Sequence, residues 1–113
     1  MKLPAEASLL RIFIGESDKA GGRPLFEVIV EEARRQGLAG ATVMRGFLGF
    51  GANSRIHTAK VLRLSQDLPV VVEIVDAAEK IDAFLPRLEG MIEEGLVTLE
   101  KVRVIAYRHN HRG

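Results

Sequence analysis

Apolar and polar residues recur along the chain with two different periods. Residues 9–15 place Leu10, Ile12 and Ile14 on one side of an alternating segment, which predicts a strand. The segment "GATVMRGFL" predicts a second strand and "AKVLRLS" a third. After the turn "DLP", the apolar run "VVVEIVD" is typical of a buried strand, and we interpret it as the continuation of the third strand beyond that turn. The segment "LVTLEKVRVIAY" predicts the last strand or pair of strands.

A period near 3.6 residues predicts a first helix that begins at Pro24, because a proline N–H is not needed in the first turn. Its apolar stripe is Leu25, Phe26, Ile29, Val30 and Ala33, with Glu27, Glu31, Glu32 and Arg35 on the opposite, polar side. Gly37 is a typical C-terminal glycine and is expected to end this helix.

A second helix follows the buried strand. Asp76 and Glu79 have the spacing of a capping box. Pro86 is expected to kink the helix, and Gly95 to close it. The apolar stripe is Ile81, Phe84, Leu85, Leu88, Met91 and Ile92.

The resulting order, β-α-β-β-α-β, predicts an α+β, ferredoxin-like fold with an antiparallel sheet and two helices on one face. The other face of the sheet is also apolar, with Leu9, Phe13, Val71, Val75, Ile105 and Tyr107. Such a surface is unusual on a soluble monomer, so we expect subunits to bury it. The alternative is that Arg11, Glu73 and Arg103 keep this face in contact with water.

Composition narrows the classes of function. With 113 residues the chain is expected to be a single domain, residues 1–113. The absence of cysteine excludes disulfides and thiolate chemistry, and the net charge of +1 does not indicate a nucleic-acid partner. No apolar run approaches the roughly 18 residues needed to cross a membrane, so a cytoplasmic protein is expected.

The segment "VMRGFLGFGANSRIHTAK", residues 43–60, is the main candidate for a binding site. Glycine permits positive φ and close backbone approach, and N–H groups in glycine turns bind anions. Arginines beside them can bind phosphate. A bulged strand with a tight turn is the alternative interpretation. The candidate residues in this segment are Arg45, Gly46, Gly49, Gly51, Arg55 and His57.

The sequence offers little support for a metal site or for catalysis. His57, His109 and His111 have no carboxylate or cysteine spacing that supports a metal site, so unliganded surface histidines are the favoured interpretation. There is neither a nucleophile elbow nor an evident acid pair, so no enzyme activity and no cofactor are expected.

With this topology, the sequence resembles the PII signalling superfamily and, within it, the PII-like family of unknown function called domain of unknown function one-ninety. "GATVMRGFLGFG" is similar to the PII strand that ends in Val-Lys-Gly-Phe-Gly before the mobile T-loop. "DLPVVVEIVD" is similar to the PII segment that follows this loop. "IHTAKVLRLSQDLPVVVEIVD" and "EGLVTLEKVRV" resemble the smaller family itself. The resemblance covers residues 8–107, the expected core of the domain.

The resemblance implies a PII-like homotrimer with ligand clefts between subunits, each beside the base of a mobile loop at residues 49–57. In PII proteins these clefts bind ATP or ADP, and the loop docks onto transporters or enzymes. C-terminal arginines of PII contact the phosphates, and Arg108 lies in a similar region. The turn after the second helix keeps only Gly95 of the PII pattern and lacks its lysine.

The leading hypothesis is therefore a non-enzymatic PII-like regulator that binds a small anionic ligand, an adenine nucleotide being the first candidate. A membrane transport protein is the partner class that the resemblance implies. Two alternatives remain open: a divalent-metal-binding trimer of the cation-tolerance type, and a small enzyme on a ferredoxin-like scaffold.

Overall fold

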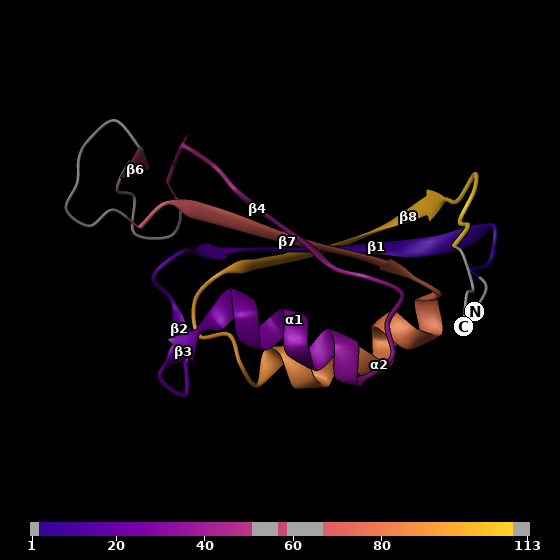
Figure 1. The fold of residues 1–113 in the computed structure, drawn as a ribbon, viewed down its shortest axis with the longest axis horizontal. Coiled ribbons are helices and arrows are strands. Elements are labelled where there is room, and N and C mark those ends of the chain that lie inside the picture. The colour runs from indigo at the N-terminus through magenta and orange to yellow at the C-terminus, as the bar shows by residue number, and fades with distance from the viewer. Residues whose placement is uncertain (1–2, 51–56, 59–66, 110–113) are drawn as a thin grey trace.

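The computed structural model describes residues 3–50, 57–58 and 67–109. In this part of the chain a four-stranded antiparallel sheet carries two helices on one face (Figure 1). The elements are β1 (Glu6–Gly15), β2 (Lys19–Ala20), β3 (Arg23–Pro24), α1 (Leu25–Arg35), β4 (Thr42–Arg45), β5 (Leu48–Gly49), β6 (His57–Thr58), β7 (Pro69–Asp76), α2 (Ala78–Glu89) and β8 (Leu96–Arg103).

The strand order is β4-β7-β1-β8, and every neighbouring pair is antiparallel. This arrangement confirms the predicted ferredoxin-like α+β fold. The short pairs β2–β3 and β5–β6 extend from the same end of the sheet, opposite to the chain termini (Figure 1). The predicted strand "AKVLRLS" lies outside the described residues, and β7 starts after it at Pro69.

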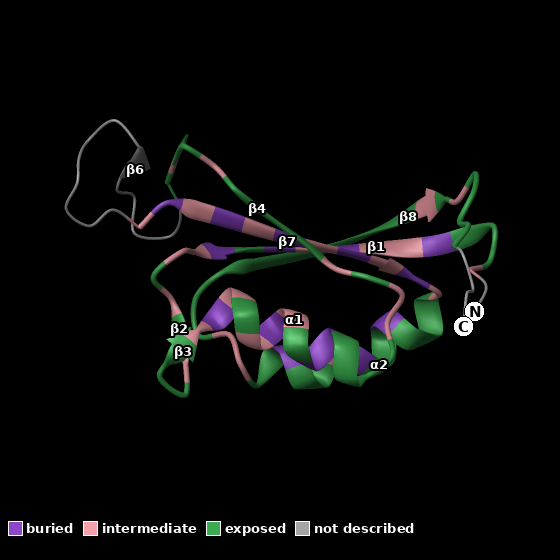
Figure 2. Ribbon diagram, in the orientation of Figure 1, coloured by how far each residue is buried: buried purple, intermediate pink, exposed green. Residues whose placement is uncertain are grey.

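The core lies between the sheet and the helices. Across β1 and β7, Leu10 pairs with Ile74 and Ile12 with Val72, and all four side chains are buried in one cluster with residues of both helices. Figure 2 shows buried segments along these two strands and along the helices. Burying a large aliphatic side chain is worth about 1.5–3 kcal/mol. Because every second residue in the middle of these strands is apolar and buried, one face of the sheet packs against the helices.

Gly37, the glycine predicted to end the first helix, directly follows Gln36, the C-cap of α1. This glycine has a φ of +80°, and its N–H donates to the Arg34 carbonyl while the Leu38 N–H donates to the Ala33 carbonyl. This is the Schellman arrangement, which favours glycine at its left-handed position. The helix buries Leu25 and Ile29 of its predicted stripe.

The predicted capping box of the second helix is wrong. The residue before α2 is Ala77, and no side chain among the described residues caps the helix. The buried Asp76 carboxylate instead accepts hydrogen bonds from the N–H groups of Ala39 at 2.8 Å and Ala77 at 2.7 Å. Since Ala39 lies between α1 and β4, Asp76 ties that connection to the end of β7.

The predicted end of the second helix is also wrong. Pro86 lies inside the last turn of α2, which ends at Glu89 with Gly90 as its C-cap. Gly95 does not close the helix but precedes β8, with a φ of +157° and a Cβ position only 2.9 Å from the Phe13 carbonyl oxygen. Close packing against β1 is therefore the reason for a glycine here.

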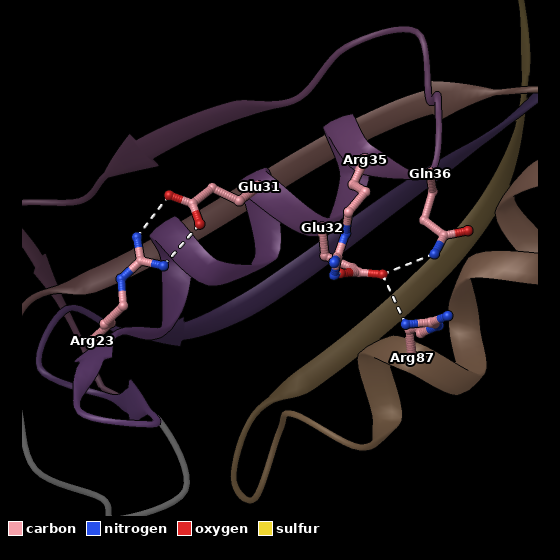
Figure 3. Close-up of polar contacts among 6 residues, drawn as sticks. All are labelled: Arg23, Glu31, Glu32, Arg35, Gln36 and Arg87. Carbon is pink, nitrogen blue, oxygen red and sulfur yellow. Dashed lines mark hydrogen bonds and ion pairs between the residues drawn. The ribbon is translucent and has the colours of Figure 1, made fainter.

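Glu32 departs from its predicted position on the polar side of the first helix. Its side chain is buried between α1 and α2, where it pairs with Arg35 and accepts hydrogen bonds from Gln36 at 2.8 Å and Arg87 of α2 at 3.2 Å (Figure 3). The neighbouring Glu31 pairs with Arg23 instead (Figure 3). Glu32 thus joins the two helices through its carboxylate.

The face of the sheet away from the helices is mixed in character, and we call it the open face. Its apolar residues are Leu9, Phe13, Met44, Val71, Val75 and Leu96, all half-buried or exposed. Among them, Arg11 binds Glu73 and Glu100, each at 2.8 Å. Arg103 was predicted to share this face with Arg11, but it lies opposite Glu6 in the strand register and therefore belongs to the helix side. The residue of β8 that contacts Arg11 on the open face is Glu100.

The last strand is shorter than the pattern predicts. It ends at Arg103, so Ile105 and Tyr107 lie in an irregular segment after β8, where both are exposed. On the helix side, Val43 of β4 and Leu99 of β8 are also exposed, at 37% and 45%. Apolar surface therefore extends from the open face around both edges of the sheet.

Candidate ligand-binding site

Arg45 is the last residue of β4, at the end of the sheet from which β5 and β6 extend. It pairs with Val70 of β7, and the N–H of the next residue, Gly46, donates to the Pro69 carbonyl at 2.8 Å. The guanidinium is largely exposed and its Nη1 donates to Glu16 Oε2 at 2.8 Å. The backbone of Arg45 is thus fixed while its charged group faces solvent.

Gly46 and Gly49 both pack against the ring of Pro69. A Cβ atom on Gly46 would lie 3.1 Å from Pro69 Cγ, and one on Gly49 would lie 3.0 Å from the same atom. Neither glycine has a positive φ, so the conformational reason predicted for them is wrong. A side chain at either position would be in tight contact with the proline ring, which would have to shift by a few tenths of an ångström.

The predicted site residues beyond Gly49 are only partly described. In the pairing of β5 with β6, Gly49 lies opposite His57. Gly51 and Arg55 lie outside the described residues. The fold therefore gathers Arg45, Gly46 and Gly49 around Pro69 and brings the backbone of His57 beside them.

The turn after β1 completes this end of the sheet and was not predicted from the sequence as part of the site. Glu16 N–H donates to the Leu68 carbonyl at 2.8 Å, and Ser17 N–H to Asp67 Oδ1 at 2.8 Å. Glu16 lies in this turn and Arg45 at the end of β4, and the two are 29 residues apart in the sequence. Only the strand order brings them together, so no local motif could indicate the pair.

Arg108 lies far from this group within one chain. The segment that contains it follows β8, whose Arg103 pairs with Glu6 at the start of β1, and Val104 N–H donates to the Ala5 carbonyl at 2.7 Å. Arg45 lies near the opposite end of β1, where Gly15 pairs with Pro69 (Figure 1). One subunit does not bring Arg45 and Arg108 together.

Three exposed apolar side chains flank the candidate site. Phe47, Leu48 and Phe50 have exposed fractions of 77%, 63% and 67%. They follow Arg45 and Gly46 along the chain, within β5 and on either side of it. The surface beside the candidate site is therefore strongly apolar.

The described part of the chain, residues 3–50, 57–58 and 67–109, offers neither a metal site nor a membrane-spanning helix. No group of three His, Cys, Asp or Glu residues there could hold a metal ion. Of the three histidines considered above, His109 has its ring 5.6 Å from that of Tyr107, tilted by 52°, and His111 lies outside these ranges. No helix within the same ranges has the length and hydropathy required to cross a membrane.

The DUF190 family, described as "Uncharacterized ACR, COG1993", matches residues 7–104. A UPF0166 protein of Aquifex aeolicus is 45% identical over 97 residues, which cover 86% of this chain and 91% of that protein. A UPF0166 protein of Methanocaldococcus jannaschii is 35% identical over 100 residues, covering 88% and 92%.

Solved structures share the fold at lower identity. A putative PII-like signalling protein from Thermus thermophilus has a TM-score of 0.65 at 20% identity, covering 89% of this chain and 91% of that one. CPII, a nitrogen regulatory PII-like protein from Thiomonas intermedia K12 bound to ADP, AMP and bicarbonate, has a TM-score of 0.59 at 17% identity, covering 88% of each chain. The fold of this chain is therefore PII-like.

Proposed function

Since this chain belongs to the DUF190 family and has a PII-like fold, we propose that it is a non-enzymatic regulatory protein that binds an adenine nucleotide between the subunits of a homotrimer. Residues 1–113 act as a single cytoplasmic domain in this proposal. The ligand residues are Arg45, Gly46, Gly49, Gly51, Arg55, His57 and Arg108.

The main observation behind this proposal is the distance between Arg45 and Arg108 within one chain. β1 has ten residues, and a strand of that length extends about 33 Å. A nucleotide cannot contact both arginines of one chain across such a distance. If both bind one ligand, they come from two subunits, and the site forms only on assembly.

The open face supports assembly. Its apolar residues would stay in water in a monomer, and the exposed side chains at the edges, such as Val43 and Leu99, add to this surface. Arg11 is already paired with two carboxylates, Glu73 and Glu100. A paired charge costs much less to bury than an isolated one, so this network is compatible with a subunit interface.

The chemistry at the end of β4 favours a phosphate. A guanidinium binds phosphate oxygens through two parallel N–H bonds, and Arg45 presents its guanidinium from a fixed backbone. Adenine nucleotides are the appropriate probes, because CPII from Thiomonas intermedia, which has the same fold, is bound to ADP and AMP.

The proposal assigns the contact with a partner protein to residues 49–57, the loop that Gly46 and Gly49 introduce. Phe47 lies just before this loop and Phe50 within it, and both are exposed and supply apolar area for such a contact. A membrane transport protein is the proposed partner class.

Titration calorimetry with ADP tests the proposal on the intact protein, with its mass measured by sedimentation equilibrium. We expect a trimer, and we expect Arg45→Ala and Arg108→Ala each to weaken ADP about 10- to 100-fold, as for the loss of a charge-assisted hydrogen bond. Arg34→Ala, which removes an exposed arginine from α1, is the matched control and should leave the affinity unchanged. A monomer, or ADP binding that is insensitive to both arginines, would refute the proposal.

A further inference from the structure

We infer that Glu16 is an internal competitor at the anion site: its carboxylate occupies Arg45 when the site is empty and must leave when an anion binds there. This inference rests on the proposed function, because it assumes that Arg45 contacts the ligand. The inference adds Glu16 to the residues that determine the affinity of this site for anions.

The Glu16–Arg45 contact has the geometry of a ligand contact. Glu16 Oε2 accepts a hydrogen bond from Arg45 Nη1 at 2.8 Å, within the range of charge-assisted bonds to phosphate. The Arg45 side chain is 60% exposed and that of Glu16 is 32% exposed. Solvent and solutes can therefore reach the pair, and the carboxylate takes up part of the guanidinium that a phosphate would use.

Both partners are held by their backbones, so the exchange requires only side-chain movement. Glu16 N–H donates to the Leu68 carbonyl at 2.8 Å, and Gly46 N–H, directly after Arg45, donates to the Pro69 carbonyl at 2.8 Å. Leu68 and Pro69 are consecutive residues at the start of β7. Glu16 and Arg45 are thus fixed to adjacent points of one segment.

The other carboxylates near this turn have different roles. Asp18 Oδ2 accepts the Gly15 N–H at 3.0 Å, and Asp67 Oδ1 accepts the Ser17 N–H at 2.8 Å. These two carboxylates bind the backbone of the turn and hold its shape. Glu16 is the carboxylate that this turn directs to Arg45.

An exposed ion pair of this kind contributes little to stability, so an anion can displace it. Water screens an exposed ion pair, whereas a phosphate forms two charge-assisted bonds to a guanidinium and carries more charge than a carboxylate. ADP would displace Glu16, and its measured affinity would be lowered by the strength of the pair that it breaks.

The test is calorimetric titration of ADP into Glu16→Gln, which removes the competing charge and keeps the side-chain length. We expect affinity to rise about two- to fivefold, the factor that corresponds to one exposed ion pair. Asp82→Asn, which removes an exposed carboxylate from the middle of α2, is the control for net charge and should not change the affinity.

The double variant Glu16→Gln/Arg45→Ala separates competition for Arg45 from a general charge effect. We expect the gain from Glu16→Gln to vanish when Arg45 is absent. An equal gain in both backgrounds, or a loss of affinity in Glu16→Gln, would overturn the inference while leaving the proposed function intact if Arg45→Ala still weakens ADP. ADP binding that is insensitive to Arg45→Ala would refute both.

Discussion

At the scale of single residues, packing against a neighbouring side chain, and not backbone conformation, explains why position 46 is a glycine. Its φ is not positive, but a Cβ at this position would lie only 3.1 Å from Pro69 Cγ, closer than most Cβ contacts in proteins. A sequence shows that a glycine is present, but not which of the two reasons applies. Pro69 is 23 positions away and meets Gly46 only because β4 and β7 pair.

This contact gives a prediction for Gly46→Val. The branched side chain overpacks against Pro69, so the free energy of unfolding should fall by about 1–3 kcal/mol in urea denaturation. Gly40→Val is the matched control, because a Cβ at Gly40 meets nothing within 4 Å and its φ is not positive. Equal stability of the two variants would contradict the packing argument.

At the scale of elements, the periodic patterns correctly predict the strands and helices that cover the core. They are weaker at the ends of elements and at polar residues. Asp76 has the spacing of a helix cap, yet its carboxylate binds Ala39 of a distant connection. The helical spacing of Glu32 predicts a solvent-exposed side chain, yet this side chain is buried and accepts a hydrogen bond from Arg87 of α2. Both outcomes depend on which elements pack together, and the local sequence does not contain that information.

The Glu32 contacts give a prediction about pH. The hydrogen bond from Arg35, with that from Gln36, lowers the pKa of Glu32 below its ordinary value of 4.5. A lowered pKa stabilises the folded state above the unfolded pKa, and this contribution disappears as pH falls through the folded pKa. Glu32→Gln should therefore lower Tm at neutral pH, and the difference from wild type should vanish as the pH falls through the lowered pKa of Glu32 in the folded state, where wild-type Glu32 becomes protonated.

Glu31→Gln is the control for this measurement. Arg23 lowers the pKa of Glu31, but the pair is exposed and its contribution is screened by water. We expect a smaller change of Tm for this variant at neutral pH. If thermal denaturation showed Glu32→Gln to be no more destabilising than Glu31→Gln, or showed its effect to persist in acid, the interhelical role of Glu32 would be wrong.

At the scale of the whole molecule, the sequence predicts the ferredoxin-like fold from the order of its elements and an apolar open face from the second parity of its strands. The candidate site is predicted less completely. Arg45, Gly46 and Gly49 lie together, but Glu16 was missed and Arg108 lies at the other end of the sheet. Residues that meet through strand order or between subunits leave no pattern in the local sequence.

The central claim, that the site forms between subunits, is tested most directly with mixed trimers of two defective variants. Arg45→Ala and Arg108→Ala subunits carrying different tags are coexpressed, and trimers that retain both tags are purified and titrated with ADP. In a cyclic trimer of two kinds of subunit, roughly one interface in three joins an intact Arg45 to an intact Arg108. We predict one site of wild-type affinity per mixed trimer, although neither variant has one alone. Mixed trimers that bind ADP as weakly as the separate variants would contradict the claim.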